Sequence, residues 1–349
     1  MLKQEDKGQG CRLNPLNLQD FSDCLVDNIA EPANKVKNFF TVKSANQVLK
    51  DAYLLPPQKE LFGKLWFEHE ICCLFADTNT GKSILAVQVA ETIAGNNSLL
   101  NCDIPPAAVL YFDFELSEKQ FQTRYTEGNQ LYQFSDKFQR IEINPDADIP
   151  ATQTFEDCLT EQIEELVISS GAKILIIDNL TYLRSDNEKA KDALPLMKKL
   201  KQLKSKYQLS ILILAHTPKR DNTRPLGKND LAGSKMLINF VDSAFCIGES
   251  QKDSKLRYIK QVKSRNAEII YDAENIMVCK VIKQDAFLQF SLAEYGKESD
   301  HLQEKKKRDS ELDNKILQLH QDEPHLSDRA IAERLETNHK KVGRVLSKN

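Results

Sequence analysis

Five short apolar runs recur along the chain, and helical stretches separate several of them. Each run is continuously apolar instead of alternating with polar residues, which is typical of strands that are covered on both faces. The runs occupy residues 71–76, 108–112, 173–177, 209–215 and 243–247. Such strands alternating with helices predict an α/β fold with a mostly parallel sheet.

Three later stretches, at 257–262, 277–282 and 288–292, alternate between apolar and polar residues. This alternation predicts an antiparallel edge on the same sheet. A short helix is expected over 45–53, before the Pro56-Pro57 break. We therefore expect a core domain over 43–295, preceded by a loosely ordered, polar extension over 1–42.

The chain changes character after Tyr295. Residues 296–309 are rich in charge and predict a linker. A separate helical unit is expected over 310–349, with helices at 312–319, 328–335 and 338–346. Ser327 and Thr337 are the expected caps of the second and third helices.

The third of these helices carries Lys340, Lys341 and Arg344 and no carboxylate. This pattern favours a helix-turn-helix unit whose last helix enters the major groove of duplex DNA. A helical bundle that binds another protein is the alternative.

The overall composition is that of an ordinary globular protein, because 41% of residues are hydrophobic and 28% are charged. A formal net charge of −3 means that any nucleic-acid surface must be local. The eight cysteines contain no Cys-x-x-Cys pair, so neither a disulfide framework nor a zinc site is expected. Without a membrane-length apolar run or a signal-peptide pattern, we expect a cytoplasmic protein with no membrane partner.

The strongest chemical signal is a candidate phosphate-binding loop between an apolar strand and a helical run. The loop comprises Ala76, Asp77, Thr78, Asn79, Thr80, Gly81, Lys82, Ser83 and Ile84. Its backbone N–H groups would surround phosphates, Lys82 would reach the β- and γ-oxygens, and Ser83 would ligate Mg²⁺. The predicted cofactors are ATP and Mg²⁺, although Ala76 replaces the usual first glycine. An ordinary surface turn is the alternative.

Carboxylates follow two other predicted strands. Asp178 ends the run at 174–177, where a nucleotide site holds Mg²⁺. Glu115 follows the run at 109–112 and is a candidate base for polarising the attacking water. Both would face the ligand crevice, because the strand ends of a parallel sheet line it. Alternatively, Asp113 or Glu115 caps the helix that starts near Ser117.

His216 follows a fourth strand and is a candidate sensor of the γ-phosphate, with a purely structural histidine as the alternative. The segment after it, 218–230, contains glycine and prolines and few apolar residues. Its basic residues are Lys219, Arg220, Arg224 and Lys228. They are candidate DNA contacts, and a solvated charged loop is the alternative.

Lys263 and Arg265 form a Lys-x-Arg pair after the predicted strand at 259–262. Such a pair can project two cations into the nucleotide site of a neighbouring subunit, as an arginine finger does. A basic turn at the sheet edge is the alternative.

Six segments in this order resemble the RecA-like P-loop NTPase core of the RepA and DnaB hexameric helicases, and especially the RepA-like ATPases of plasmids and mobile elements. They are the phosphate loop, Asp-Phe-Glu at 113–115, Leu-Ile-Ile-Asp-Asn at 175–179, Leu-Ala-His-Thr at 214–217, Leu-Ala-Gly-Ser at 231–234 and Lys-Ser-Arg-Asn at 263–266.

The resemblance covers roughly residues 44–292. It implies a RecA-type fold and a homo-oligomeric ring, expected to be a hexamer, with nucleotide between subunits. It also implies that Glu115 is the catalytic base and that Lys263 and Arg265 act in trans. The C-terminal addition is a departure from minimal plasmid helicases.

The sequence thus predicts a Mg²⁺-dependent ATPase that moves on DNA, and specifically a replicative helicase of a plasmid or mobile element. Single-stranded DNA would contact the core, and duplex DNA the C-terminal helices. One alternative is a DNA-binding regulator that ATP switches on and off. Another is an ATPase that loads or scaffolds a partner primase or recombinase.

Overall fold

The computed structural model describes residues 40–95, 100–179, 193–218, 220–231, 234–303 and 307–347. The chain divides into two compact units, Met1–Pro56 and Pro57–Asn349. Most of the expected extension over 1–42, and Lys219 of the basic loop, lie outside the described residues. Within the part of the chain that the structure describes, no helix has both the length and the apolar character needed to cross a membrane.

The described part of the first unit contains one helix, α1 (Ala45–Tyr53), with the bounds expected from the sequence. It begins where the Ser44 hydroxyl accepts a hydrogen bond from the Gln47 amide, at 3.2 Å. None of the helix residues is buried, and Leu49 and Tyr53 are strongly exposed. The helix thus presents apolar side chains to solvent.

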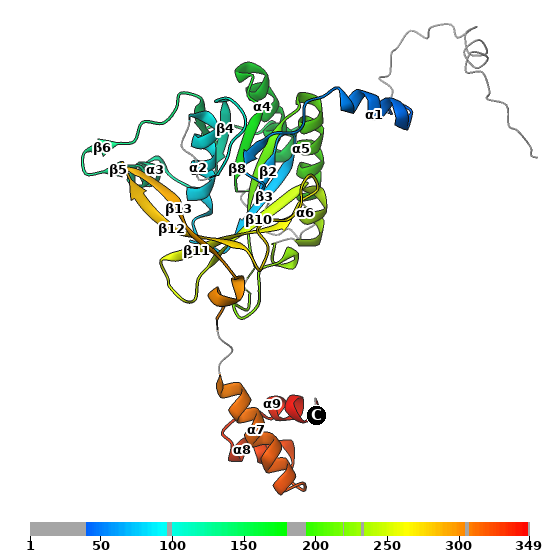
Figure 1. The fold of residues 1–349 in the computed structure, drawn as a ribbon, viewed down its shortest axis with the longest axis vertical. Coiled ribbons are helices and arrows are strands. Elements are labelled where there is room, and N and C mark those ends of the chain that lie inside the picture. The colour runs from blue at the N-terminus through cyan, green and yellow to red at the C-terminus, as the bar shows by residue number, and fades with distance from the viewer. Residues whose placement is uncertain are drawn as a thin grey trace, which may run out of the picture. The chain divides into compact units, whose positions relative to one another are not determined.

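One large sheet dominates the second unit, and its nine described strands follow the order β13-β12-β11-β10-β3-β9-β8-β4-β7 (Figure 1). The strands are β3 (Ile71–Ala76), β4 (Val109–Asp113), β7 (Phe138–Ile141), β8 (Ile174–Asp178), β9 (Ser210–His216), β10 (Ser243–Glu249), β11 (Leu256–Lys263), β12 (Ile276–Gln284) and β13 (Phe287–Gly296). Strands β10, β3, β9, β8, β4 and β7 are parallel, and β11 to β13 continue the sheet antiparallel. The mostly parallel sheet and its antiparallel edge are confirmed.

Helices cover both faces of the sheet (Figure 1). Helix α2 (Lys82–Ala94) packs on one face, and α4 (Phe155–Ser170), α5 (Ala193–Tyr207) and α6 (Ser234–Phe240) pack on the other. Successive residues of each central strand enter opposite clusters, which is why these strands are apolar throughout. Because both faces of these strands are covered by apolar side chains, polar side chains can cluster only at the strand ends.

Several short elements were not expected from the sequence. They are β1 (Glu60–Phe62), β2 (Trp66–Phe67), β5 (Thr126–Glu127), β6 (Gln130–Leu131) and β7, whereas the helix α3 (Glu118–Arg124) starts where a helix was expected, near Ser117. Strand β7 has only four residues, two of them polar, and its position is set by pairing with β4. Such a segment is too short for a periodic pattern to reveal it.

The expected linker over 296–309 is wrong in its first part. A 3₁₀ helix, η2 (Glu298–His301), follows β13, and both Glu298 and His301 are buried. The many charged residues of this segment predicted that it would be exposed to solvent. A buried carboxylate is nevertheless stable when hydrogen-bond donors and a cation surround it. A shorter 3₁₀ turn, η1 (Lys228–Asp230), lies within the basic loop.

The C-terminal helices are α7 (Lys307–Asp322), α8 (Asp328–Arg334) and α9 (His339–Leu346), which enclose their own apolar cluster. Ser327 caps α8 as expected. The cap of α9 is Asn338 instead of Thr337, because the Asn338 side chain accepts from the Lys340 amide at 2.9 Å. The Thr337 amide instead donates to the Ala332 carbonyl, at 2.8 Å, and closes the turn between α8 and α9.

Candidate active site

The phosphate loop joins β3 to the start of α2. Gly81 precedes the helix with φ of 101°, a left-handed conformation that favours glycine. A Cβ atom at this position would also lie 3.0 Å from the Phe290 ring of β13. Two independent constraints therefore require glycine here. The helix behind the loop directs its first N–H groups toward the loop, which is the geometry for binding an anion.

Lys82 is held inside the loop. Its side chain is buried, and its ammonium donates to the Ala76 carbonyl at 3.0 Å and to the Asp77 carbonyl at 2.8 Å. Burial lowers the pKa of Lys82, and the charges of Glu115, Asp178 and Asp77 oppose that effect. Ala76 is a fully buried residue of β3, so its methyl group fits without the usual glycine.

Asp178 ends β8 and is completely buried. Its Oδ2 accepts a hydrogen bond from the Tyr111 hydroxyl at 2.7 Å, while its Oδ1 has no hydrogen-bond partner among the described residues. Burial raises the pKa of Asp178 to about 6, and the Ser83 and Tyr111 hydroxyls act in the opposite direction. A carboxylate with an unpartnered oxygen beside a serine hydroxyl fits the oxygen ligands that Mg²⁺ and its water shell require.

Asn179 links two of the expected catalytic residues. Its Nδ2 donates to Glu115 Oε2 at 3.0 Å and lies 3.0 Å from His216 Nε2. The chain thus brings Glu115, Asn179 and His216 together from the ends of β4, β8 and β9. Sequence analysis had quoted Asn179 only within a motif. Its place directly after Asp178, at a strand end, is the signal that could have assigned it to the site.

Asp113 shapes the turn that presents Glu115. Its Oδ1 accepts from the Glu115 amide at 3.1 Å and the Leu116 amide at 2.9 Å, and its Oδ2 pairs with Arg140 at 2.8 Å. Helix α3 is capped by Ser117 and Gln120 in a capping box. Neither Asp113 nor Glu115 is therefore the helix cap, and the exposed Glu115 carboxylate is left to contact Asn179.

His216 and Thr217 connect β9 to the phosphate loop. Burial lowers the pKa of His216, and the nearby charge of Lys82 lowers it further. Within the described residues, His216 Nδ1 is buried without a hydrogen-bond partner. The Thr217 amide donates to the Ala76 carbonyl at 3.1 Å, and its hydroxyl donates to the Asp77 carboxylate. Thr217 is a second site residue that sequence reasoning missed.

The described basic residues of the loop after β9 differ in their exposure to solvent. Arg220 is half-buried, and its guanidinium donates to the Arg224 carbonyl at 3.1 Å. Arg224 and Lys228 are exposed. Of the described basic residues in this loop, Arg224 and Lys228 are therefore the two best placed to meet a nucleic acid.

Lys263 and Arg265 lie far from the phosphate loop of their own chain. Ile259 of β11 and Ala76 of β3 both pair with Ile247 of β10, so they lie at the same level in the sheet. Lys263 lies four residues further along β11, about 13 Å away toward the amino ends of the parallel strands. Lys263 donates to the Val241 carbonyl at 2.7 Å, and Arg265 pairs with Asp242 at 3.0 Å. The structure does not bring these two cations to the other site residues.

The C-terminal cations also differ from one another. Lys340 and Arg344 are exposed on α9. The Lys341 side chain is only 18% exposed and lies 3.9 Å from the Asp313 carboxylate of α7. Lys341 thus packs toward α7, whereas Lys340 and Arg344 remain accessible on α9.

A strand that runs into a phosphate loop, a helix behind it and carboxylates at neighbouring strand ends define a P-loop nucleotide-binding protein. A family model described as an AAA domain matches residues 41–222, just over half of the chain, and the chain belongs to this family of P-loop ATPases. The family is of the DnaB- and RecA-like helicase type. The comparison with curated proteins gives no match. The matched segment contains Lys82, Glu115, Asp178 and His216 and ends before Lys263.

Proposed function

We propose that this chain hydrolyses ATP with Mg²⁺ and uses the hydrolysis to move on DNA, as a RepA-like replicative helicase of a plasmid or mobile element. The observation that carries the proposal is the hydrogen-bonded series Glu115, Asn179 and His216 at adjoining strand ends. A water-polarising carboxylate tied to a phosphate sensor is what coupled phosphoryl transfer requires.

Each site residue has a chemical role in this proposal. Lys82 contacts the β- and γ-phosphate oxygens, and Glu115 orients the attacking water and accepts its proton. Ser83 and Asp178 hold Mg²⁺, which neutralises charge on the phosphates when bound. Burial and the charge of Lys82 lower the pKa of His216 and so favour its neutral form, which would donate a hydrogen bond to a γ-phosphate oxygen.

The protein would work as a homo-oligomer, and specifically as a hexameric ring. Lys263 and Arg265 lie toward the amino ends of the parallel strands, and the phosphate loop lies at the carboxyl ends. These two cations would therefore reach a γ-phosphate only in a neighbouring subunit. The exposed apolar residues of α1 also support contacts between copies.

Two separate surfaces would contact DNA. Arg224 and Lys228, with Lys219, would hold single-stranded DNA, and Lys340 and Arg344 would contact duplex DNA through a helix-turn-helix unit. The enzyme would act in the cytoplasm, and a partner primase or recombinase belongs to the alternative in which the ATPase loads or scaffolds such a protein.

A second candidate function is a DNA-binding regulator that ATP switches. The separate apolar cluster of α7 to α9, with exposed Lys340 and Arg344, favours it, because such a unit could select a DNA site by itself.

The test compares wild type, Glu115→Gln and Glu118→Gln in ATP turnover with and without single-stranded DNA, and in displacement of a DNA strand. We expect Glu115→Gln to lower turnover by about 10²–10⁴-fold while ATP still binds, since general-base catalysis contributes this much. Glu118, exposed in the first turn of α3, is the control and should leave turnover unchanged.

Three outcomes would contradict parts of the proposal. Loss of ATP binding in Glu115→Gln, with normal turnover per bound ATP, would show that Glu115 is not the base. Normal binding and turnover in Lys82→Ala would overturn the phosphate-loop assignment. ATP turnover without strand displacement would favour the regulator.

A further inference from the structure

A buried ion pair lies in the core outside the candidate active site. Glu298 is completely buried, and its Oε2 pairs with the ammonium of Lys260, a β11 residue that is 8% exposed. Glu298 Oε1 accepts from the Tyr258 hydroxyl at 3.2 Å. A buried pair costs desolvation energy, which is offset only where further hydrogen bonds satisfy both groups.

Those further hydrogen bonds go to one residue of the basic loop. The Leu226 amide donates to Glu298 Oε1 at 2.7 Å, and the Leu226 carbonyl accepts from Lys260 Nζ at 2.7 Å. Both backbone polar groups of Leu226 are therefore held by the ion pair. Arg224 and Lys228, the exposed cations of the loop, lie two residues before and after it.

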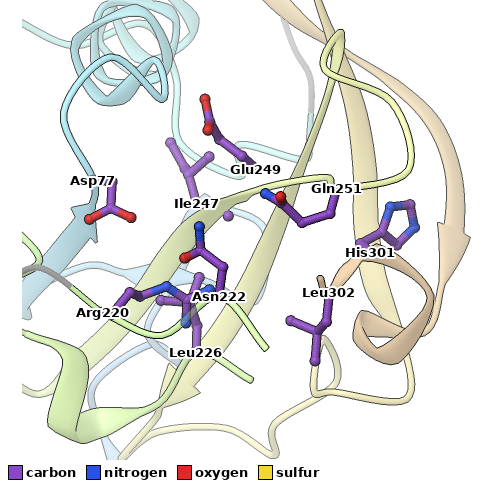
Figure 2. Close-up of a pocket in the computed structure, with 10 residues that line it drawn as sticks. Asp77, Arg220, Asn222, Leu226, Ile247, Glu249, Gln251, His301 and Leu302 are labelled. Carbon is purple, nitrogen blue, oxygen red and sulfur yellow. The ribbon is translucent and has the colours of Figure 1, made fainter. Parts of the chain in front are cut away.

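The same loop is also held against the segment that follows β13. The Gln303 amide, from this segment, donates to the Asn222 carbonyl of the loop at 3.1 Å. Figure 2 shows Arg220, Asn222 and Leu226 between Asp77 of the phosphate loop and the residues His301 and Leu302, all lining one pocket.

The basic loop thus has two fixed neighbours. Thr217 ties its start to the phosphate loop, through Ala76 and Asp77. The ion pair of Lys260 and Glu298 ties its centre to β11 and η2. A displacement of the loop by a nucleic acid must therefore disturb one of these two ties or the hydrogen bond between Gln303 and Asn222, and the tie through Thr217 leads directly to the phosphate loop.

We infer that Glu298, acting with Lys260, is a positioning residue that fixes Arg224 and Lys228 relative to the phosphate loop. Through this fixed position, DNA bound at the loop and nucleotide bound at the phosphate loop influence each other. The DNA response rests on the proposed function, whereas the placement of the loop does not. Both residues lie outside the segment matched by the AAA domain family.

The test uses two double variants that both remove the charges. Lys260→Met with Glu298→Gln keeps a side-chain oxygen that can accept from the Leu226 amide. Lys260→Met with Glu298→Leu has similar volume but no acceptor. Because replacing a whole buried ion pair by neutral groups is often close to neutral for stability, both variants should fold. The exposed pair of Lys206 and Glu164, broken by Glu164→Gln, is the control for losing an ion pair elsewhere.

Two measurements follow. The first is hydrogen exchange at the Leu226 amide without DNA or nucleotide, where we expect exchange at least about tenfold faster in the leucine variant than in the glutamine variant. The second is ATP turnover. The stimulation by single-stranded DNA should be at least about fivefold smaller in the leucine variant than in the glutamine variant, and the turnover of the two variants without DNA should agree within about twofold.

Equal hydrogen-exchange rates at the Leu226 amide in the two variants would overturn the inference. Faster exchange in the leucine variant without any loss of DNA-stimulated ATP turnover would overturn it as well. If the wild type shows no stimulation by DNA, the proposed function fails, and the exchange measurement still decides whether the ion pair places the loop. Should the leucine variant not fold, the single variant Glu298→Asp, with Lys260 retained, is compared with wild type, because it keeps both charges but shortens the side chain away from Leu226. The aspartate variant should then show faster hydrogen exchange at the Leu226 amide and weaker stimulation of ATP turnover by DNA. If either change is missing, the inference is overturned.

Discussion

At the scale of single residues, the candidate active site depends on one amide side chain. Glu115 is exposed and His216 is only partly buried, so neither is fixed by packing alone. Asn179, which is buried, contacts both. A hydrogen bond to an ionised group contributes about 1.5–3 kcal/mol, enough to hold a carboxylate in one orientation.

We therefore expect Asn179→Ala to lower the rate of ATP turnover by about 10–100-fold, since that is the rate equivalent of one such hydrogen bond. The affinity for ATP should change by less than about threefold, because the Asn179 side chain acts on Glu115 and His216, which follow β4 and end β9, and Lys82 of the phosphate loop is held by other groups. Steady-state turnover and equilibrium ATP binding measure the two quantities. Asn101→Ala, at an exposed position, is the control. Equal loss of affinity and turnover would show that Asn179 supports the fold instead of Glu115.

At the scale of elements, the antiparallel edge is fitted to the parallel core by a close approach between two strands. Gly248 of β10 pairs directly with Tyr258 of β11. A Cβ atom on Gly248 would lie 2.1 Å from the Tyr258 ring, a distance that no side chain can tolerate. The tyrosine ring therefore occupies the space that glycine leaves, and its hydroxyl reaches Glu298.

Gly248→Ala should lower the free energy of unfolding by about 1–3 kcal/mol or more, because overpacking forces the ring or the strand to move. Gly296→Ala in β13 is the matched control, since its added Cβ would meet Val278 at an ordinary 3.6 Å. Chemical denaturation of both variants measures the difference. Similar stabilities would mean that Tyr258 can turn away without cost.

At the scale of the whole molecule, the two ends of the sheet carry complementary halves of one proposed site. The phosphate loop lies at the carboxyl ends of the parallel strands, and Lys263 and Arg265 lie toward the other end. One chain cannot bring the two halves together, so the proposed site would be completed only by a second copy.

Mixing inactive variants tests this arrangement. Arg265→Ala subunits keep the phosphate loop, and Lys82→Ala subunits keep the cations, so mixed oligomers should recover part of the ATP turnover that either variant lacks. Turnover is measured across mixing ratios, with mixed oligomers verified by mass. Activities that merely add would show that Arg265 does not act between subunits.

The C-terminal helices allow a prediction with an internal control. Lys340→Ala and Arg344→Ala should each weaken duplex binding and reduce the dependence of log affinity on log salt concentration by about one unit, because each removes one phosphate contact. Lys341→Ala should change the slope less, since Lys341 packs toward Asp313. Deletion of residues 305–349 should weaken duplex binding, flatten its salt dependence and leave basal ATP turnover. Unchanged duplex affinity and salt slope, together with lost recovery of a partner protein, would show that this unit is a protein-docking module.

Local patterns in the sequence were sufficient for the parallel strands other than β7, for the antiparallel edge, for α1 and for the phosphate loop. Each of these is encoded by neighbouring residues, such as the continuous apolar run that ends at Ala76 and the Gly-Lys-Ser that begins α2. Asp178 and Glu115 became candidates for the same reason, because Asp178 ends β8 and Glu115 lies two residues beyond β4, and the apolar pattern of both strands is evident.

Only the tertiary structure decided which distant residues meet. The contact of Asn179 with both Glu115 and His216 depends on the order of β4, β8 and β9 in the sheet. The burial of Glu298 depends on Lys260 and on Leu226 of a remote loop. A charged residue has the same local pattern whether it is solvated or paired, because the partner that permits burial is supplied by the fold and not by its sequence neighbours.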